Sequence, residues 1–171
     1  GLLHFATDNG DGANGINAGT VIKGLDKLAQ SIANKLNDLN TRAGAYCIDP
    51  NDTGKLQPTT ADNLIFVAGT GANTANGITA GNIQINSDLL ADDGCWKIAC
   101  AYFNDAKNVD LSAVGNALNV EQMLLTRNEK LNDLDGSSIG EYYTSLVGKV
   151  AAAGSNIKSL ADTQDQLVES I

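Results

Sequence analysis

Acidic side chains cluster after a short alternating stretch in the segment GNIQINSDLLADDG, residues 81–94. Asp88, Asp92 and Asp93 carry carboxylates, which are the usual ligands of calcium. Their order lacks the alternating oxygen ligands and the central glycine of an EF-hand loop. The stretch DNGDGANG at 8–15 comes closer, but it has no glutamate at the distal position. We therefore predict no metal site, and weak calcium binding at 8–15 remains an open alternative.

The same segment carries the signals of a strand that turns into a helix. Ile83 and Ile85 alternate with polar residues, as in a half-buried strand. Residues 86–88, Asn-Ser-Asp, have side-chain oxygens that satisfy the free N–H groups at a helix start. We therefore interpret 81–94 as a strand followed by a helix that begins near Leu89, and not as an acidic site.

Residues able to perform nucleophilic or redox chemistry are scarce. The chain has three cysteines, Cys47, Cys95 and Cys100, and one histidine, His4. Three thiols cannot all pair within one molecule. On a helix, Cys95 and Cys100 would lie roughly 140° apart, which is poor geometry for a shared zinc ion. We interpret the cysteines as buried apolar thiols. Because no base accompanies a nucleophile, the sequence predicts neither an enzyme nor a bound cofactor.

The overall charge excludes two classes of partner. The formal net charge is −9 and the isoelectric point is near 4.3, whereas phosphate binding requires clustered Lys and Arg. We therefore expect binding to neither nucleic acid nor anionic membranes. No apolar run approaches the roughly 18 residues of a membrane span, and no charged segment followed by an apolar one marks a cleavable signal. The length of 171 residues fits one domain, and aromatic residues make up only 5%, so the core must be mostly aliphatic.

Helical periodicity identifies three regions around these residues. Apolar residues recur every three or four positions in 19–40, which predicts a helix with one apolar stripe, capped by Thr20 or a nearby residue. Its members are Ile22, Leu25, Leu28, Ile32, Leu36 and Leu39. Helical patterns return in 88–106 and 112–134. Residues 45–87 differ, because β-prone runs alternate there with turn residues, and we predict an insert of two to four strands.

The last segment carries the longest regular pattern in the chain. Mostly apolar positions from 139 to 171 are separated alternately by four and three residues, the heptad spacing of a helix that needs a partner. We predict that helix 19–40 covers part of this seam. The predicted packing or interface residues are Ile139, Tyr143, Leu146, Val150, Ile157, Leu160 and Leu167.

These patterns together predict a mainly α fold, an elongated antiparallel helical bundle with coiled-coil-like packing and a small β-rich insert. Residues 1–44 would supply a loop and the first long helix. Residues 45–87 would form the insert, and residues 88–171 the remaining helices of the bundle.

Several stretches, taken in order, resemble one protein family. GLLHF at 1–5 precedes the helix GLDKLAQSIANKLNDLN, and GNIQINSDLLADD, GNALNVEQML and IGEYYTSLVGKVAAAGSNIKSLADTQDQLVES follow. These stretches are similar to segments of flagellar hook-associated proteins of the hook–filament junction type. The Arg-Asp that this family carries after the first Phe is replaced here by Ala6-Thr7-Asp8, and residues 45–80 match no segment of the family.

The resemblance implies a structural role in the bacterial flagellum. Such a subunit forms a ring of identical copies between hook and filament and contacts the hook and the adjacent junction subunits. It is secreted to the extracellular flagellum by type III export without a cleavable signal, and an export chaperone binds a terminal region. The chain begins at Gly1, and its last pattern reaches Ile171 without a stop signal. We therefore expect a fragment that lacks both terminal helical regions and is a monomer on its own.

Two other classes of function remain open. A surface adhesin or phage-tail-like structural protein would also be helical and rich in Asn and Gly, and it would bind a surface ligand through the insert at 45–87.

A calcium-dependent module would use the loop at 8–15, and calcium would then raise its melting temperature because the ligand binds the native state.

Overall fold

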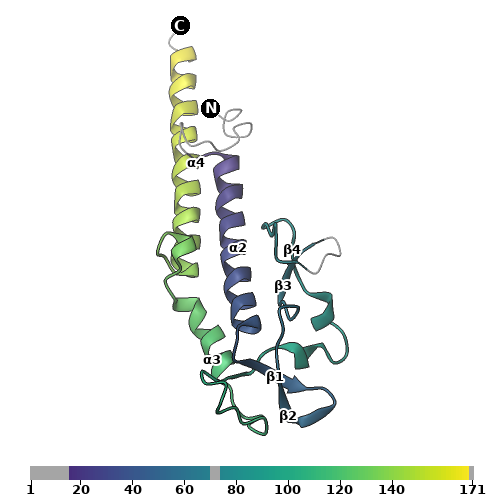
Figure 1. Cartoon of the computed structure of the whole chain (residues 1–171). Helices are drawn as coiled ribbons and strands as arrows, with labels where there is room; N and C mark the ends of the chain where they lie inside the picture. Colours follow the sequence, from purple (N-terminus) through teal and green to yellow (C-terminus); the bar gives the residue numbers. More distant parts are fainter. Residues whose placement is uncertain (1–15, 70–73, 170–171) are drawn as a thin grey trace.

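The computed structural model describes residues 16–69 and 74–169, which form a mixed α/β fold (Figure 1). Two long helices, α2 (Ala18–Thr41) and α4 (Ile139–Glu169), lie side by side in opposite directions. Two small antiparallel sheets lie beside and below α2, away from α4. The predicted mainly α fold, an elongated antiparallel bundle with coiled-coil-like packing, is therefore wrong. Only two of the predicted helices are long enough to pack along each other, and sheets and turns occupy the remaining space.

The two sheets have simple topologies. In the first, β1 (Ala45–Asp49) pairs with β2 (Asp52–Pro58) on one side and with β5 (Ala101–Tyr102) on the other. In the second, β3 (Phe66–Ala68) pairs with β4 (Ile83–Ile85). Four strands thus lie within the described part of 45–87, in agreement with the predicted number, and the first sheet takes its third strand from a segment further along the chain.

Local signals set both ends of α2. The side chain of Asn17 accepts a hydrogen bond from the backbone N–H of Thr20 at 2.8 Å, and the hydroxyl of Thr20 accepts one from the backbone N–H of Asn17 at 2.8 Å. This reciprocal capping box satisfies N–H groups that lack partners at a helix start. Beyond the end of the helix, Gly44 has a φ of +87°, and a Cβ there would collide with the carbonyl oxygen of Phe103. Only glycine fits this turn.

The two predicted helices between the sheets and α4 are largely replaced by short turns. In 88–106, 3₁₀ turns at η1 (Ser87–Leu89) and η2 (Gly94–Lys97) precede β5, so the helix predicted near Leu89 is wrong. A Cβ on Gly94 would collide with the backbone of Leu89, which shows how tightly the chain folds back here. In 112–134, the α-helix is limited to α3 (Leu118–Leu125), and turns η3 (Thr126–Asn128) and η4 (Asn132–Leu134) follow.

The helix α2 lies at the centre of the packing. On one side Ala33 packs with Ala68 and Ile78 in a small core beside β3 and β4. On the other side Gly24 faces α4, and a Cβ on Gly24 would lie 2.9 Å from Cδ1 of Leu146. The absence of a side chain at Gly24 therefore lets Leu146 pack directly onto the backbone of α2.

The contact between α2 and α4 gives a stability prediction. Leu146 is 8% exposed, whereas Leu160 on the same helix is 59% exposed. We expect Leu146→Ala to lower the free energy of unfolding by about 2–4 kcal/mol, because it removes buried methyl groups and leaves a cavity. The matched change Leu160→Ala should alter it by less than about 0.5 kcal/mol. Urea denaturation measures both, and equal effects of the two changes would contradict the packing described.

Candidate functional site

The apolar seam of α4 is the candidate functional surface, and it divides into a covered and an exposed part. Leu146 is buried, and Ile139 and Ile157 are half-buried. The other predicted residues are exposed: Tyr143 (52%), Val150 (36%), Leu160 (59%) and Leu167 (60%). The seam is therefore not packed within the described chain as a coiled coil would be, although the partial cover predicted from helix 19–40 is present.

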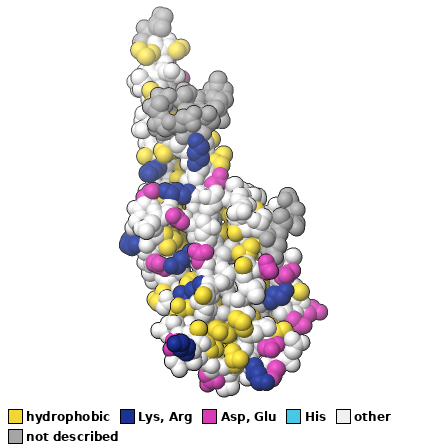
Figure 2. Space-filling view, viewed as in Figure 1, with side chains coloured by type: hydrophobic (Ala, Val, Ile, Leu, Met, Phe, Trp, Pro, Cys, Tyr) yellow, Lys and Arg dark blue, Asp and Glu magenta, His cyan; other side chains and the backbone are white. Residues whose placement is uncertain are grey.

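The difference in length between the two helices explains why Leu160 and Leu167 are exposed, whereas Tyr143 and Val150 are exposed although they lie level with α2. Gly24, which faces Leu146, lies six residues after Ala18, the first residue of α2. Because the helices are antiparallel, α2 begins level with about residue 152 of α4 (146 + 6), and the remaining residues up to Glu169 extend about 25 Å further at 1.5 Å each. Figure 1 shows α4 running past the start of α2, and Figure 2 shows some hydrophobic side chains exposed near the tip of this narrow end.

Polar contacts fix the start of α4 to the body. The Ser138 backbone N–H donates to the Glu141 carboxylate at 2.8 Å, and the Glu141 N–H donates to the Ser138 hydroxyl at 3.3 Å, which forms a second capping box. Lys130 also forms an ion pair with Glu141. Lys130 and the two Ser138 contacts lower the pKa of Glu141 from 4.5 to about 2. A further ion pair, Lys27 to Asp135 at 2.7 Å, ties α2 to the turn before α4.

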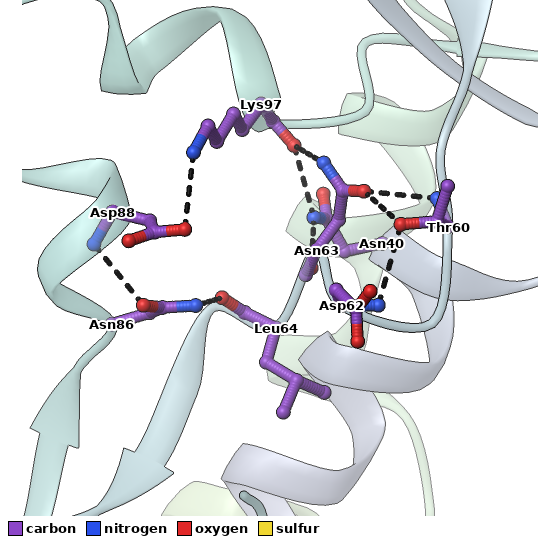
Figure 3. Close-up of polar contacts among 8 residues, drawn as sticks. All are labelled: Asn40, Thr60, Asp62, Asn63, Leu64, Asn86, Asp88 and Lys97. Atoms are coloured by element: carbon purple, nitrogen blue, oxygen red, sulfur yellow. Dashed lines mark hydrogen bonds and ion pairs between the residues drawn. The ribbon is translucent and has the colours of Figure 1, made fainter. Parts of the chain in front are cut away.

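The acidic segment proves to be a turn held by asparagines (Figure 3). The side chain of Asn86 accepts from the Asp88 N–H at 3.1 Å and donates to the Leu64 carbonyl at 3.0 Å. Asp88 forms an ion pair with Lys97 at 3.1 Å. The predicted cap at Asn86 is therefore confirmed, but it caps a 3₁₀ turn. In the described part of the chain, no group of three or more His, Cys, Asp or Glu side chains could hold a metal ion, and the loop at 8–15 lies outside the described residues.

A cleft that the sequence did not predict opens beside this turn. Its volume is about 510 Å³, and segments from the first sheet, the following loop and η2 surround it. The lining includes Pro50, Gln57, Asn63, Asp92, Asp93 and Trp96. An indole ring beside carboxylates and amides offers both a stacking face and hydrogen-bonding groups. Trp96 is the only tryptophan of the chain.

The cysteines differ from one another in exposure. Cys47 is buried, Cys100 is half-buried and Cys95 is exposed. The interpretation as buried thiols is therefore confirmed for Cys47 and wrong for Cys95, which lies on the surface turn η2. His4 lies outside the described residues.

Comparison with protein-family models, with curated proteins and with solved structures finds no match to this chain. Within the residues that the structure describes, no helix combines the length and the apolar character needed to cross a membrane. Any functional proposal therefore depends on the residues and on their geometry.

The sequence analysis did not predict the close contact at Gly24 or the cleft around Trp96, for two different reasons. Gly24 lies inside the helical pattern of 19–40, and because an isolated glycine weakens a helix, it points to a packing reason. The close contact at Gly24 could therefore have been predicted from the sequence. The cleft around Trp96 was not predictable, because the segments that line it are distant in sequence.

The start of α4 gives a pH prediction. Since the folded-state pKa of Glu141 is lowered from 4.5 to about 2, its contacts stabilise the protein above pH 4.5, and this contribution is lost as the pH falls towards 2. We expect Glu141→Gln to lower Tm slightly at pH 7, because the pair is exposed and screened by solvent, and the difference from wild type to vanish near pH 2. Calorimetry at pH 7, 4.5 and 2.5 tests this, with Glu169→Gln at the far end of α4 as the control. A Tm difference for Glu141→Gln that stays constant with pH would contradict it.

Proposed function

We propose that the protein is a structural subunit of the bacterial flagellum, a hook-associated protein at the junction between hook and filament. The observation that carries the proposal is the apolar seam of α4, which continues for about 25 Å beyond the end of its intramolecular partner. The ordered stretches of sequence that resemble this family, which include α2 and α4, point in the same direction.

The proposed occupant of the exposed seam is a helix of a neighbouring copy of the protein. The seam of α4 is continuous with the part already covered by α2, so a helix placed in line with α2 would meet the same heptad spacing. An apolar stripe exposed on one face of a helix is typical of a protein–protein contact. Burial of Leu160, which is 59% exposed, would remove apolar surface from water and favour association.

Deletion of the gene in the source bacterium tests the proposal. If the protein joins hook and filament, electron microscopy should show bare hooks, and flagellin should accumulate in the medium because filaments cannot be held. Intact filaments on the deletion strain would reject the proposed function.

Complementation of the deletion strain tests the surface itself. We expect Leu160→Asp to restore few or no filaments, because a charge cannot be buried in an apolar contact without a partner. The matched control Ser155→Asp introduces the same charge on the opposite side of α4 and should restore filaments as wild type does. Secreted levels of both variants must be equal. If both variants restore filaments equally, the seam is not the contact surface.

The cleft around Trp96 favours a second candidate, a surface adhesin or phage-tail-like protein that binds a ligand partly through the insert at 45–87. Pro50, Gln57 and Asn63 of the insert line the cleft together with Trp96. Because Trp96 is the only tryptophan, its fluorescence reports directly on occupancy. For this candidate we expect a saturable change in emission on titration with a chitooligosaccharide or with a triarginine peptide. If the fluorescence emission of Trp96 stays unchanged at millimolar concentrations of both compounds, the cleft no longer supports the adhesin candidate.

A further inference from the structure

Cys47 lies in β1, and Cys100 immediately precedes β5, the neighbour of β1 in the first sheet. The register of β1 and β5 pairs Ala45 with Tyr102 and Tyr46 with Ala101. The next pair in this antiparallel register is Cys47 with Cys100. Directly opposite residues of antiparallel strands project to the same face of the sheet, so both thiols lie on one side.

The hydrogen-bond pattern places this pair at a close position. The Phe103 N–H donates to the Gly44 carbonyl at 2.9 Å, which makes 44 and 103 a hydrogen-bonded pair. Hydrogen-bonded and non-hydrogen-bonded pairs alternate along the ladder, so 47 and 100 form a non-hydrogen-bonded pair. In such pairs the Cα atoms are about 4.5 Å apart, which lies within the range of about 4.4–6.8 Å that a disulfide spans. The Sγ of Cys100 already lies 3.8 Å from the carbonyl oxygen of Tyr46 in β1.

We propose that Cys47 and Cys100 are a modification site at which a small-molecule disulfide, such as oxidised glutathione, drives formation of an intramolecular cross-strand disulfide. The thiolate of Cys100, which is half-buried and therefore the more accessible of the two, attacks the oxidant and releases one small thiol. The thiolate of Cys47 then attacks the Cys100 sulfur and releases the second small thiol. The protein dithiol is oxidised to a disulfide, the small disulfide is reduced to two thiols, and the two protein thiol protons pass to the released thiolates.

Burial determines the rate of the second step. Desolvation raises the pKa of Cys47, and the neighbouring Cys100 contributes in the same direction. Since the thiolate is the nucleophile, closure of the disulfide is slow at neutral pH and accelerates as the pH rises. Cys95 is exposed on η2 and has no place in this register.

The closed disulfide joins β1 to the segment that leads into β5. It encloses residues 48–99, and a loop of this length gives a large restriction of the unfolded chain. In a chain of this size we expect the oxidised protein to melt roughly 5–15 °C higher than the reduced protein. This inference is independent of the proposed function, because it concerns only the first sheet.

The test uses the whole chain in glutathione buffers of increasing oxidised fraction, followed by alkylation of free thiols and peptide mapping under non-reducing conditions. We expect one cross-linked peptide pair that contains Cys47 and Cys100, with Cys95 alkylated or carrying glutathione. Cys95→Ser should give the same cross-link and the same rise in Tm, whereas Cys100→Ser should leave Cys47 reduced. The peptide map of the wild-type protein is sufficient to test the proposal. A disulfide from Cys95 to either of the other cysteines would overturn it. So would a Cys47 that stays reduced in fully oxidised buffer at pH 8.5.

Discussion

Buried asparagine side chains hold the irregular half of the molecule to α2, and the rest of the fold depends on these contacts. Asn37 accepts hydrogen bonds from the N–H groups of Ile65 and Phe66 and donates one to the Phe66 carbonyl. Its side chain thus satisfies backbone groups at the start of β3 that a paired strand would otherwise satisfy. Asn40 donates to the carbonyls of Asn63 and Lys97 and accepts from the Ala99 N–H. Because the hydrophobic core beside them is small, loss of these side chains would leave buried backbone groups without partners, at about 1–3 kcal/mol for each.

The same contacts explain which elements the sequence could predict. The helices α2 and α4 follow from local signals, namely apolar periodicity and a capping box at each start. The helix expected in 88–106 had a similar pattern, but its backbone groups are bound by Asn40, which is nearly sixty positions away along the chain. No periodicity within a segment reports such a partner, and so the apparent helix became two 3₁₀ turns and a strand.

The sequence predicted which residues form the candidate surface, but not which of them are buried and which are exposed. The heptad spacing identified the residues that share one face of α4, and it cannot tell a covered position from an exposed one. For Leu146, Leu160 and Leu167 that distinction arises from two facts of tertiary structure, the length of α2 and the contact of Gly24 with Leu146. The order of Asp88 and Asp92 differs from that of an EF-hand loop, which the sequence alone shows, whereas the cleft next to them became visible only in the folded chain.

The composition of α4 adds a physical reason for a partner at its exposed end. Apart from the adjacent backbone of its own helix, Gly154 has nothing within 4 Å of where a Cβ would lie, so no contact among the described residues requires glycine there. Each glycine weakens a helix by about 1 kcal/mol relative to alanine, and beyond about residue 152 the helix receives no support from α2. In proteins most of the stability of a helix comes from tertiary packing of its apolar face rather than from intrinsic propensity. A neighbouring helix on the seam would supply the missing packing, so assembly and helical order at this end of α4 would be coupled.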